Sequence, residues 1–322
     1  MADYHIKHIT RYTYASTVID CSNQVMLYPL NDSLQIVKSH ELKITDDPAI
    51  EVFTDFFENK IGVFSVVEPH NELTIQSDIV VSTTPVIMPK DDLPAAQQWE
   101  ELNKMCGIFP YMDFMHREKF AADEQIKKLL AGIIDADKSP LINANNLSEY
   151  VYKNFEYKKG VTTIETKVDE ILELKAGVCQ DFAHVLLVML HMIGIPARYV
   201  SGYICPKNHE LRGEGATHAW VEAYIPFYGW LGLDPTNNCI VSDRHVRLAI
   251  GRNFSDCTPV KGTYKGSSEH TLEVSVIIDN GEHKTSESKD EIPTFTYTSK
   301  NPGVTNNSYQ RYLEIQQQQQ QQ

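Results

Sequence analysis

Three residues whose side chains could together perform acyl transfer follow one another along the chain. Cys179 supplies a thiol in "LKAGVCQDFAHVLLVML" (residues 174–190), His218 supplies an imidazole in "ATHAWVEAY", and Asp234 supplies a carboxylate in "WLGLDPT". Catalysis by a thiol needs a nucleophile, a base within hydrogen-bond distance, and a third group that orients the base. The residue types and their order therefore predict a cysteine-based catalytic site.

Cys179 stands directly ahead of an apolar segment that is typical of a buried helix. Residues 182–194, "FAHVLLVMLHMIG", are hydrophobic nearly all round and end in a glycine, with a proline two positions later. A thiol in the first turn of a helix feels the positive end of the helix dipole, which favours the nucleophilic thiolate. The polar residues Gln180, Asp181 and His184 are interpreted as helix-capping and supporting residues.

The histidine and the aspartate fall on two predicted strands, "THAWVEAYIP" and "GWLGLDPT", that a short turn could join. If the hairpin turns on "PFY", Ile225 pairs with Gly229 and Asp234 lies opposite Trp220. His218 is two residues from Trp220 on the same side of its strand. Diagonal neighbours across two strands are about 7 to 8 Å apart, so this register lets the side chains of His218 and Asp234 share a face.

Each of the three residues also has a common structural explanation. A cysteine at a helix start is often an inert apolar residue, and a histidine in an apolar strand is often a hydrogen-bonded core residue. An aspartate before proline often begins a turn. The combination of all three, in this order and on these elements, is much rarer than any one of them and favours the catalytic interpretation.

Two kinds of periodicity divide the chain into regions. Residues 4 to about 85 alternate at period two in at least five segments, which predicts a β-sandwich over residues 1–90. A proline-rich, charged stretch near residues 85–95 is expected to be a linker. Helices followed by strands then predict an α+β domain over residues 91–285. Residues 286–322 are polar, end in seven glutamines and are expected to form a disordered tail.

Three amphipathic helices are predicted ahead of Cys179, over residues 95–105, 122–136 and 143–155. The second and third are expected to begin at Asp or Asn caps. After the nucleophile helix, strands are predicted at "ARYVSGYI", at the two halves of the hairpin, and at "HTLEVSVII".

The composition excludes several classes of protein. The 322 residues suffice for two domains, and 43 acidic against 29 basic residues give a formal charge of −14, which opposes binding to nucleic acid or to anionic membranes. The six cysteines form no CxxC pair and suggest neither a zinc module nor a disulfide framework. No apolar leader and no run near the roughly 18 apolar residues of a membrane span is present, so we expect a soluble, cytoplasmic protein without a metal or other cofactor.

The segments "GVCQDFAH", "THAWVEAY" and "LDPT" together resemble the transglutaminase-like superfamily of papain-related cysteine enzymes. "YHIKHITRYTY" is similar to the start of the β-rich N-terminal region of its bacterial members, and "GIPARYVSGY" and "HVRLAIGRNFSDCTPVKGTYKG" resemble later segments. The resemblance covers most of residues 1–280. It implies Cys179 as nucleophile, His218 as base and Asp234 as orienting acid, with the nucleophile helix packed on an antiparallel sheet.

The expected activity is hydrolysis of a peptide or another amide through a thioester, as in a cysteine protease. The alternatives are transfer of the acyl group to an amine, a catalytically silent binding domain, and a metal site on Cys179 and His218. No acidic loop of calcium-binding spacing is apparent, which argues against a calcium-activated cross-linker. The backbone N–H of Cys179 is one candidate donor to the oxyanion. Tyr157 in "NFEYKKG" is a second candidate, and its alternative role is aromatic packing.

Overall fold

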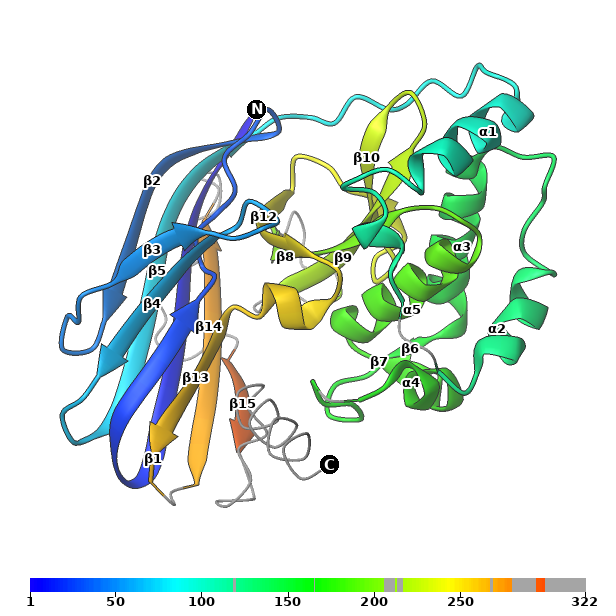
Figure 1. Cartoon of the computed structure of the whole chain (residues 1–322). Helices are drawn as coiled ribbons and strands as arrows, with labels where there is room; N and C mark the ends of the chain where they lie inside the picture. The colour runs from blue at the N-terminus through cyan, green and yellow to red at the C-terminus, as the bar shows by residue number, and fades with distance from the viewer. Residues whose placement is uncertain are drawn as a thin grey trace, which may run out of the picture.

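The computed structural model describes residues 1–117, 120–164, 166–205, 212, 217–266 and 269–279, and the backbone of 294–298. A strand-rich body and a group of helices flank a central sheet (Figure 1). The strands of the N-terminal region are β1 (Ala2–Val25), β2 (Gln35–Ile44), β3 (Glu51–Thr54), β4 (Lys60–Val66) and β5 (His70–Thr83).

The helices follow a segment without regular structure at residues 84–94, where the linker is predicted. They are α1 (Ala95–Met105), α2 (Asp123–Leu130), α3 (Pro140–Asn154), α4 (Val168–Leu174) and α5 (Cys179–Met192), with 3-10 turns η1 (Asp113–Met115) and η2 (Phe254–Cys257). The remaining strands are β6 (Glu156–Tyr157), β7 (Ala176–Gly177), β8 (Ala197–Ile204), β9 (His218–Ile225), β10 (Gly229–Asp234), β11 (Cys239–Ile240), β12 (His245–Gly251), β13 (Val260–Lys265), β14 (His270–Asp279) and β15 (Thr294–Thr298).

The N-terminal region is built around the long strand β1, which takes part in two sheets. Its first half pairs with β5 and β14, and its second half pairs with β4 and β13. The pairing slips between Ile19 and Ser22, where Asp20 has a positive φ of 50°. Such a bulge bends a strand, so one strand can pass from one sheet into the next. Alternating residues of β1 and β5 are buried in a shared apolar core, as the period-two pattern predicts.

The central sheet has the antiparallel order β11-β10-β9-β8-β12. Helix α5 packs against β8 and β9, and its residues Phe182 to Leu190 are buried apart from His184. The other face of β8 and β12 packs on the N-terminal region, because Tyr203, Val246 and Leu248 belong to its core. The fold is therefore mixed α and β, with a β-rich N-terminal region followed by a sheet that carries the buried helix, as predicted.

Strand β12 lies at one edge of the central sheet, and side chains of the N-terminal region pair with this edge. The side-chain amide of Gln35 bonds both backbone groups of Arg247, at 2.8 and 2.9 Å. The side-chain amide of Asn59 bonds both backbone groups of Ile250, at 2.7 and 2.8 Å. Gln35 and Asn59 thus supply the hydrogen bonds that a neighbouring strand would make.

Three details differ from the sequence-based expectations. Helix α3 begins at Pro140 with Ser139 as its cap, and α2 has no side-chain cap at Ala122, so the predicted Asp and Asn caps are wrong. A proline at the first position followed the serine and signalled the earlier start. Strands β13 and β14, inside the range 91–285, pair with β1 of the N-terminal region.

The expected tail also contains a strand. Residues Thr294–Thr298 form β15, which pairs with β14, and their alternation of threonine with aromatic residues suits a strand. The rest of the range 286–322 lies outside the described residues. No helix in the described part of the chain is both long enough and apolar enough to cross a membrane.

Candidate active site

Cys179 is the first residue of α5, and local interactions fix this helix start. Val178 has extended backbone angles, and its N–H donates to the Asp181 carboxylate at 2.7 Å. The hydroxyl of Thr162 donates to the same carboxylate at 2.6 Å. A side chain on Gly177 would overlap Asp181, so a glycine is required there. The thiol of Cys179 is half-buried and lies where the first N–H groups of the helix have no intrahelical partner.

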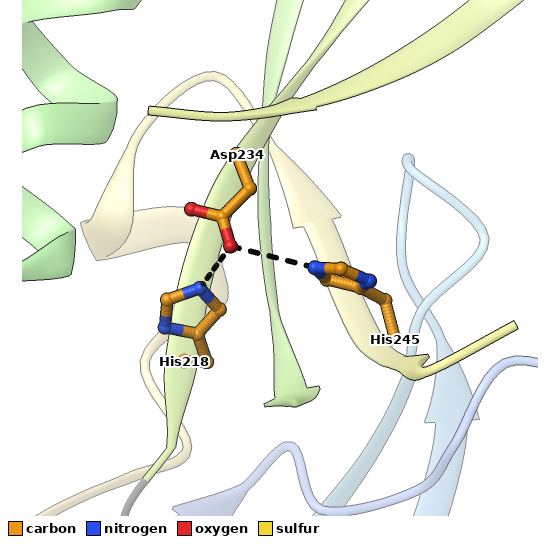
Figure 2. A group of neighbouring side chains, drawn as sticks. All are labelled: His218, Asp234 and His245. Atoms are coloured by element: carbon orange, nitrogen blue, oxygen red, sulfur yellow. Dashed lines mark hydrogen bonds and ion pairs between the residues drawn. The ribbon is translucent and has the colours of Figure 1, made fainter. Parts of the chain in front are cut away.

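His218 and Asp234 come together through the hairpin register that the sequence predicts. Ile225 pairs with Gly229, and the ladder continues to Val221 and Leu233. The imidazole Nε2 of His218 lies 2.8 Å from Oδ2 of Asp234, and both side chains are fully buried. The predicted base and the predicted acid are therefore joined directly (Figure 2).

The carboxylate of Asp234 accepts hydrogen bonds on both oxygens. Its Oδ1 accepts the backbone N–H groups of Thr236 and Asn237, at 2.9 and 3.2 Å. Its Oδ2 accepts the side-chain amide of Asn237 at 2.9 Å and is approached by Nε2 of His245 at 3.4 Å, in addition to His218. Burial alone would raise the pKa of Asp234, but the two histidines hold it well below its ordinary value. Asp234 is therefore an ionised carboxylate with hydrogen bonds on both oxygens.

His218 has one ring nitrogen on Asp234, while the other, Nδ1, is buried without a regular hydrogen bond. Burial lowers the pKa of the imidazole, but Asp234 and then the Cys179 thiol raise it, and the net result is a pKa of about 10. The thiol is thus close enough to affect the pKa of the ring, and Nδ1 has no hydrogen-bond partner among the described residues. At neutral pH the His218 ring carries a positive charge beside Cys179.

Tyr157 lies next to the chain that leads into Cys179. It pairs with Gly177 in the short parallel ladder of β6 and β7, and its ring meets Phe182 edge-on at 6.3 Å. Burial and the nearby Cys179 raise the pKa of the Tyr157 hydroxyl, so it stays protonated and can donate a hydrogen bond. The packing role and the donor role predicted for this residue are therefore compatible.

One group of described residues has the spacing of metal ligands: His218, Asp234 and His245, whose candidate atoms lie within 4.8 Å of one another. The same atoms are already occupied by hydrogen bonds. Both Nε2 atoms face Oδ2 of Asp234, and the remaining nitrogen of His245 accepts the backbone N–H of Ser242 at 3.3 Å. This buried group suits a hydrogen-bond network better than a cation, which would have to displace each of these partners.

Cys179, His218 and Asp234 are the site residues that the sequence predicts, and the structure adds His245 and Asn237 as neighbours of Asp234. The supporting roles predicted for Asp181 and His184 fit the structure, because Asp181 caps α5 and His184 accepts the backbone N–H of Phe254 at 3.2 Å. His245 begins the strand on the far edge of the sheet. Its proximity to Asp234 depends on the strand order, which the local sequence pattern does not contain.

Comparison with known families gives two matches. Residues 127–235 match the transglutaminase-like superfamily, and residues 4–82 match the bacterial transglutaminase-like N-terminal region. Cys179, His218 and Asp234 fall inside the first match, and the strands β1 to β5 make up most of the second.

Individual relatives agree with these matches. The uncharacterized protein Rv2569c of Mycobacterium tuberculosis is 33% identical over 290 residues, which cover 85% of this chain and 91% of that protein. A protein-glutamine gamma-glutamyltransferase of Pseudomonas aeruginosa is 34% identical over 163 residues, 48% of this chain and 22% of that protein. The solved structure of a "putative cysteine protease" from Cytophaga hutchinsonii has a TM-score of 0.69 at 19% identity and covers 92% of this chain and 98% of its own, which shows the same fold.

Proposed function

Because this chain belongs to the transglutaminase-like superfamily and carries its bacterial N-terminal region, we propose that it is a cysteine-dependent amide hydrolase with a Cys179–His218–Asp234 triad. One observation carries the proposal: a buried imidazole is bonded to a buried carboxylate at 2.8 Å, its other ring nitrogen has no partner among the described residues, and a thiol at a helix N-terminus is near enough to raise its pKa. This is the nucleophile, base and orienting group that thiol catalysis requires.

In the proposed reaction, the Cys179 sulfur attacks the carbonyl carbon of an amide, and the carbonyl oxygen becomes an oxyanion. Nδ1 of His218 is the ring nitrogen that exchanges protons, because Nε2 is bonded to Asp234. The imidazolium protonates the leaving nitrogen as the C–N bond breaks, which leaves a thioester on Cys179 and a neutral imidazole.

Water then attacks the thioester and His218 accepts its proton, the C–S bond breaks, and the acid is released with Cys179 as thiolate and His218 as imidazolium, the state from which the reaction began. Asp234 keeps the ring in one tautomer and stabilises its positive charge. The oxyanion forms beside the first turn of α5, where the Cys179 N–H can donate to it and the protonated hydroxyl of Tyr157 is a second donor.

The alternative is transfer of the acyl group from Cys179 to an amine. It is supported by the name of the Pseudomonas relative, a glutamyltransferase, whose similarity to this chain covers 48% of it. Both reactions share the same thioester, and they differ only in whether water or an amine resolves it. A peptide or another amide is the proposed substrate class, and the cytoplasmic location remains a prediction.

Intact-mass measurement after exposure to a panel of amide and ester acyl donors tests the proposal. We expect the mass to increase by one acyl group in the wild type and not in the Cys179→Ser variant. The increase should disappear with time as water hydrolyses the thioester. Addition of a primary amine such as cadaverine separates the two reactions: an acylated amine product supports transfer, and the free acid alone supports hydrolysis. If no donor acylates Cys179 faster than the other cysteines, the proposed function is wrong.

A further inference from the structure

We propose that His245 is a positioning residue of this site, a fourth member that holds Asp234 in the orientation that His218 needs. The inference rests on the proposed function and deepens it. His245 lies 11 residues beyond Asp234 and comes from β12, whereas His218 comes from β9. In Figure 2 the two imidazoles approach the same carboxylate oxygen from different sides.

The hydrogen bonds of His245 define its protonation. Its Nδ1 accepts the backbone N–H of Ser242 at 3.3 Å, so this nitrogen carries no proton. Its Nε2 must then carry the proton and donates it to Oδ2 of Asp234 at 3.4 Å. Asp234 therefore receives one bond from a neutral imidazole and one, at 2.8 Å, from a charged imidazole.

The neutral state of His245 matters for the chemistry. A positively charged ring would compete with His218 for the carboxylate. His245 stays neutral because it is 5% exposed and burial lowers its pKa. The charged groups that face the ring have opposite effects on its pKa. Asp234 raises the pKa of His245, whereas His218 and Arg244 lower it.

The rest of the ring is held by packing. Trp220 meets His245 edge-on at 5.2 Å, and Trp220 is itself fully buried. The strand that begins with His245 is fixed at its outer edge by the amides of Gln35 and Asn59. The N-terminal region thus contributes to the geometry of the site through β12, although none of its residues bonds Asp234.

The test compares His245→Gln, whose amide N–H₂ can reach Asp234 from nearly the position of Nε2, with His245→Met, which has no donor. His191→Met is the matched control, because His191 is another buried histidine, bonded to the Ala197 carbonyl at 3.0 Å near the opposite end of α5. Two rates are measured at Cys179: acylation by p-nitrophenyl acetate, followed by release of nitrophenolate, and alkylation by iodoacetamide as a function of pH.

We expect His245→Met to slow acylation by about tenfold or more, the usual consequence of losing a hydrogen bond to a charged group. Its alkylation profile moves to higher pH, in the direction of Asp234→Ala but less far. His245→Gln and His191→Met stay within about threefold of the wild-type rate. If His245→Met does not fold, His245→Asn replaces it in the test. The amide of asparagine is too short to reach Asp234, so we expect His245→Asn to slow acylation. His245→Gln keeps the hydrogen bond and should not slow it.

The inference is overturned if His245→Met acylates at the wild-type rate, if His245→Gln is as slow as His245→Met, or if His191→Met is equally slow. Failure of the proposed function gives a different result, because His218→Ala would then leave the alkylation profile unchanged. A shift with His218→Ala and none with His245→Met contradicts only the role of His245.

Discussion

At the scale of single residues, the site depends on opposite charges that are kept out of water. His218 and Asp234 are 1% and 0% exposed, yet the imidazole is charged at neutral pH because the carboxylate beside it is ionised. An isolated buried charge would instead lose its ionisation. Each member of the pair therefore maintains the charge of the other, and removal of either one should change the reactivity of Cys179.

We predict that Cys179 is alkylated by iodoacetamide well below pH 7, faster than the other five cysteines. His218→Ala should move this profile upward toward that of an ordinary thiol, because the neighbouring positive charge is lost. Asp234→Ala should affect alkylation less and turnover more, since its role is to hold the base. Mass spectrometry of alkylated peptides measures each cysteine separately. An unchanged profile in His218→Ala would contradict the triad.

Folding stability should depend on pH through His218. Its pKa is raised from 6.5 to about 10 on folding, so its contribution is fully present below pH 6.5 and is lost as the pH rises toward about 10. Asp234 has a lowered pKa, and its contribution is constant over this range and is lost only in acid. We expect the free energy of unfolding to fall by a few kcal/mol between pH 6.5 and 10, at about 1.4 kcal/mol per pKa unit.

Urea unfolding at several pH values measures this dependence. His218→Gln removes the titrating group and should flatten the curve relative to the wild type, while other groups that titrate near pH 10 affect both proteins equally. Parallel curves for the two proteins would show that the histidine is not charged in the folded state.

At the scale of elements, the local sequence pattern predicts the features that residues close together in the chain determine. The helix that starts at Cys179 follows from an all-round apolar segment with a terminal glycine, and the hairpin register follows from a short turn between two strands. These two features underlie the prediction of Cys179, His218 and Asp234 as one site. The approach of His245 could not be predicted, because it requires β12 to join the sheet beside β8 rather than beside β11. The cap of α3 was missed because Ser139 precedes the amphipathic stretch.

Gly202 on β8 is a position where this sheet has no room for a side chain. It pairs with His218, and an added methyl group would overlap the carbonyl oxygen of Val246 and lie 2.6 Å from the Trp220 ring. We predict that Gly202→Ala lowers the free energy of unfolding by about 1–3 kcal/mol, the usual cost of overpacking. It should also slow acylation of Cys179, because Trp220 supports the His245 ring.

The control for this prediction is Gly107→Ala, since a methyl group at Gly107 has no neighbour within 4 Å. Thermal unfolding and the acylation rate are measured on both variants. Equal stability of the two variants would mean that β8 and β12 can separate without cost.

At the scale of the whole molecule, the N-terminal region completes the central sheet. Arg247 of β12 forms an ion pair with Asp32 at 2.5 Å, and Glu222 of β9 lies between Arg247 and Arg198. Together with the amides of Gln35 and Asn59, these contacts leave the described edge of β12 paired rather than open. An open edge would be a site for association with other chains.

We predict that Asn59→Ala destabilises the whole protein by about 2–4 kcal/mol, because two buried backbone groups of Ile250 lose their partners. Asn154→Ala is the matched control, because Asn154 is exposed and bonds only the Tyr150 carbonyl among the described residues. Urea denaturation measures both variants. If Asn59→Ala lowers the free energy of unfolding no more than the control does, water must replace the hydrogen bonds to the backbone of Ile250.

The pairing of β1 with β14 also sets a time order during synthesis. His5 pairs with Asp279, so one side of β1 has no partner until almost the whole described chain has left the ribosome. At about 5–20 residues per second, this interval lasts roughly 10 to 50 seconds. Strand β1 is long and carries unpaired backbone groups throughout that time, which is when nascent chains associate with one another. Slower growth at low temperature and the presence of chaperones should therefore improve the yield of folded protein more than any change at the active site.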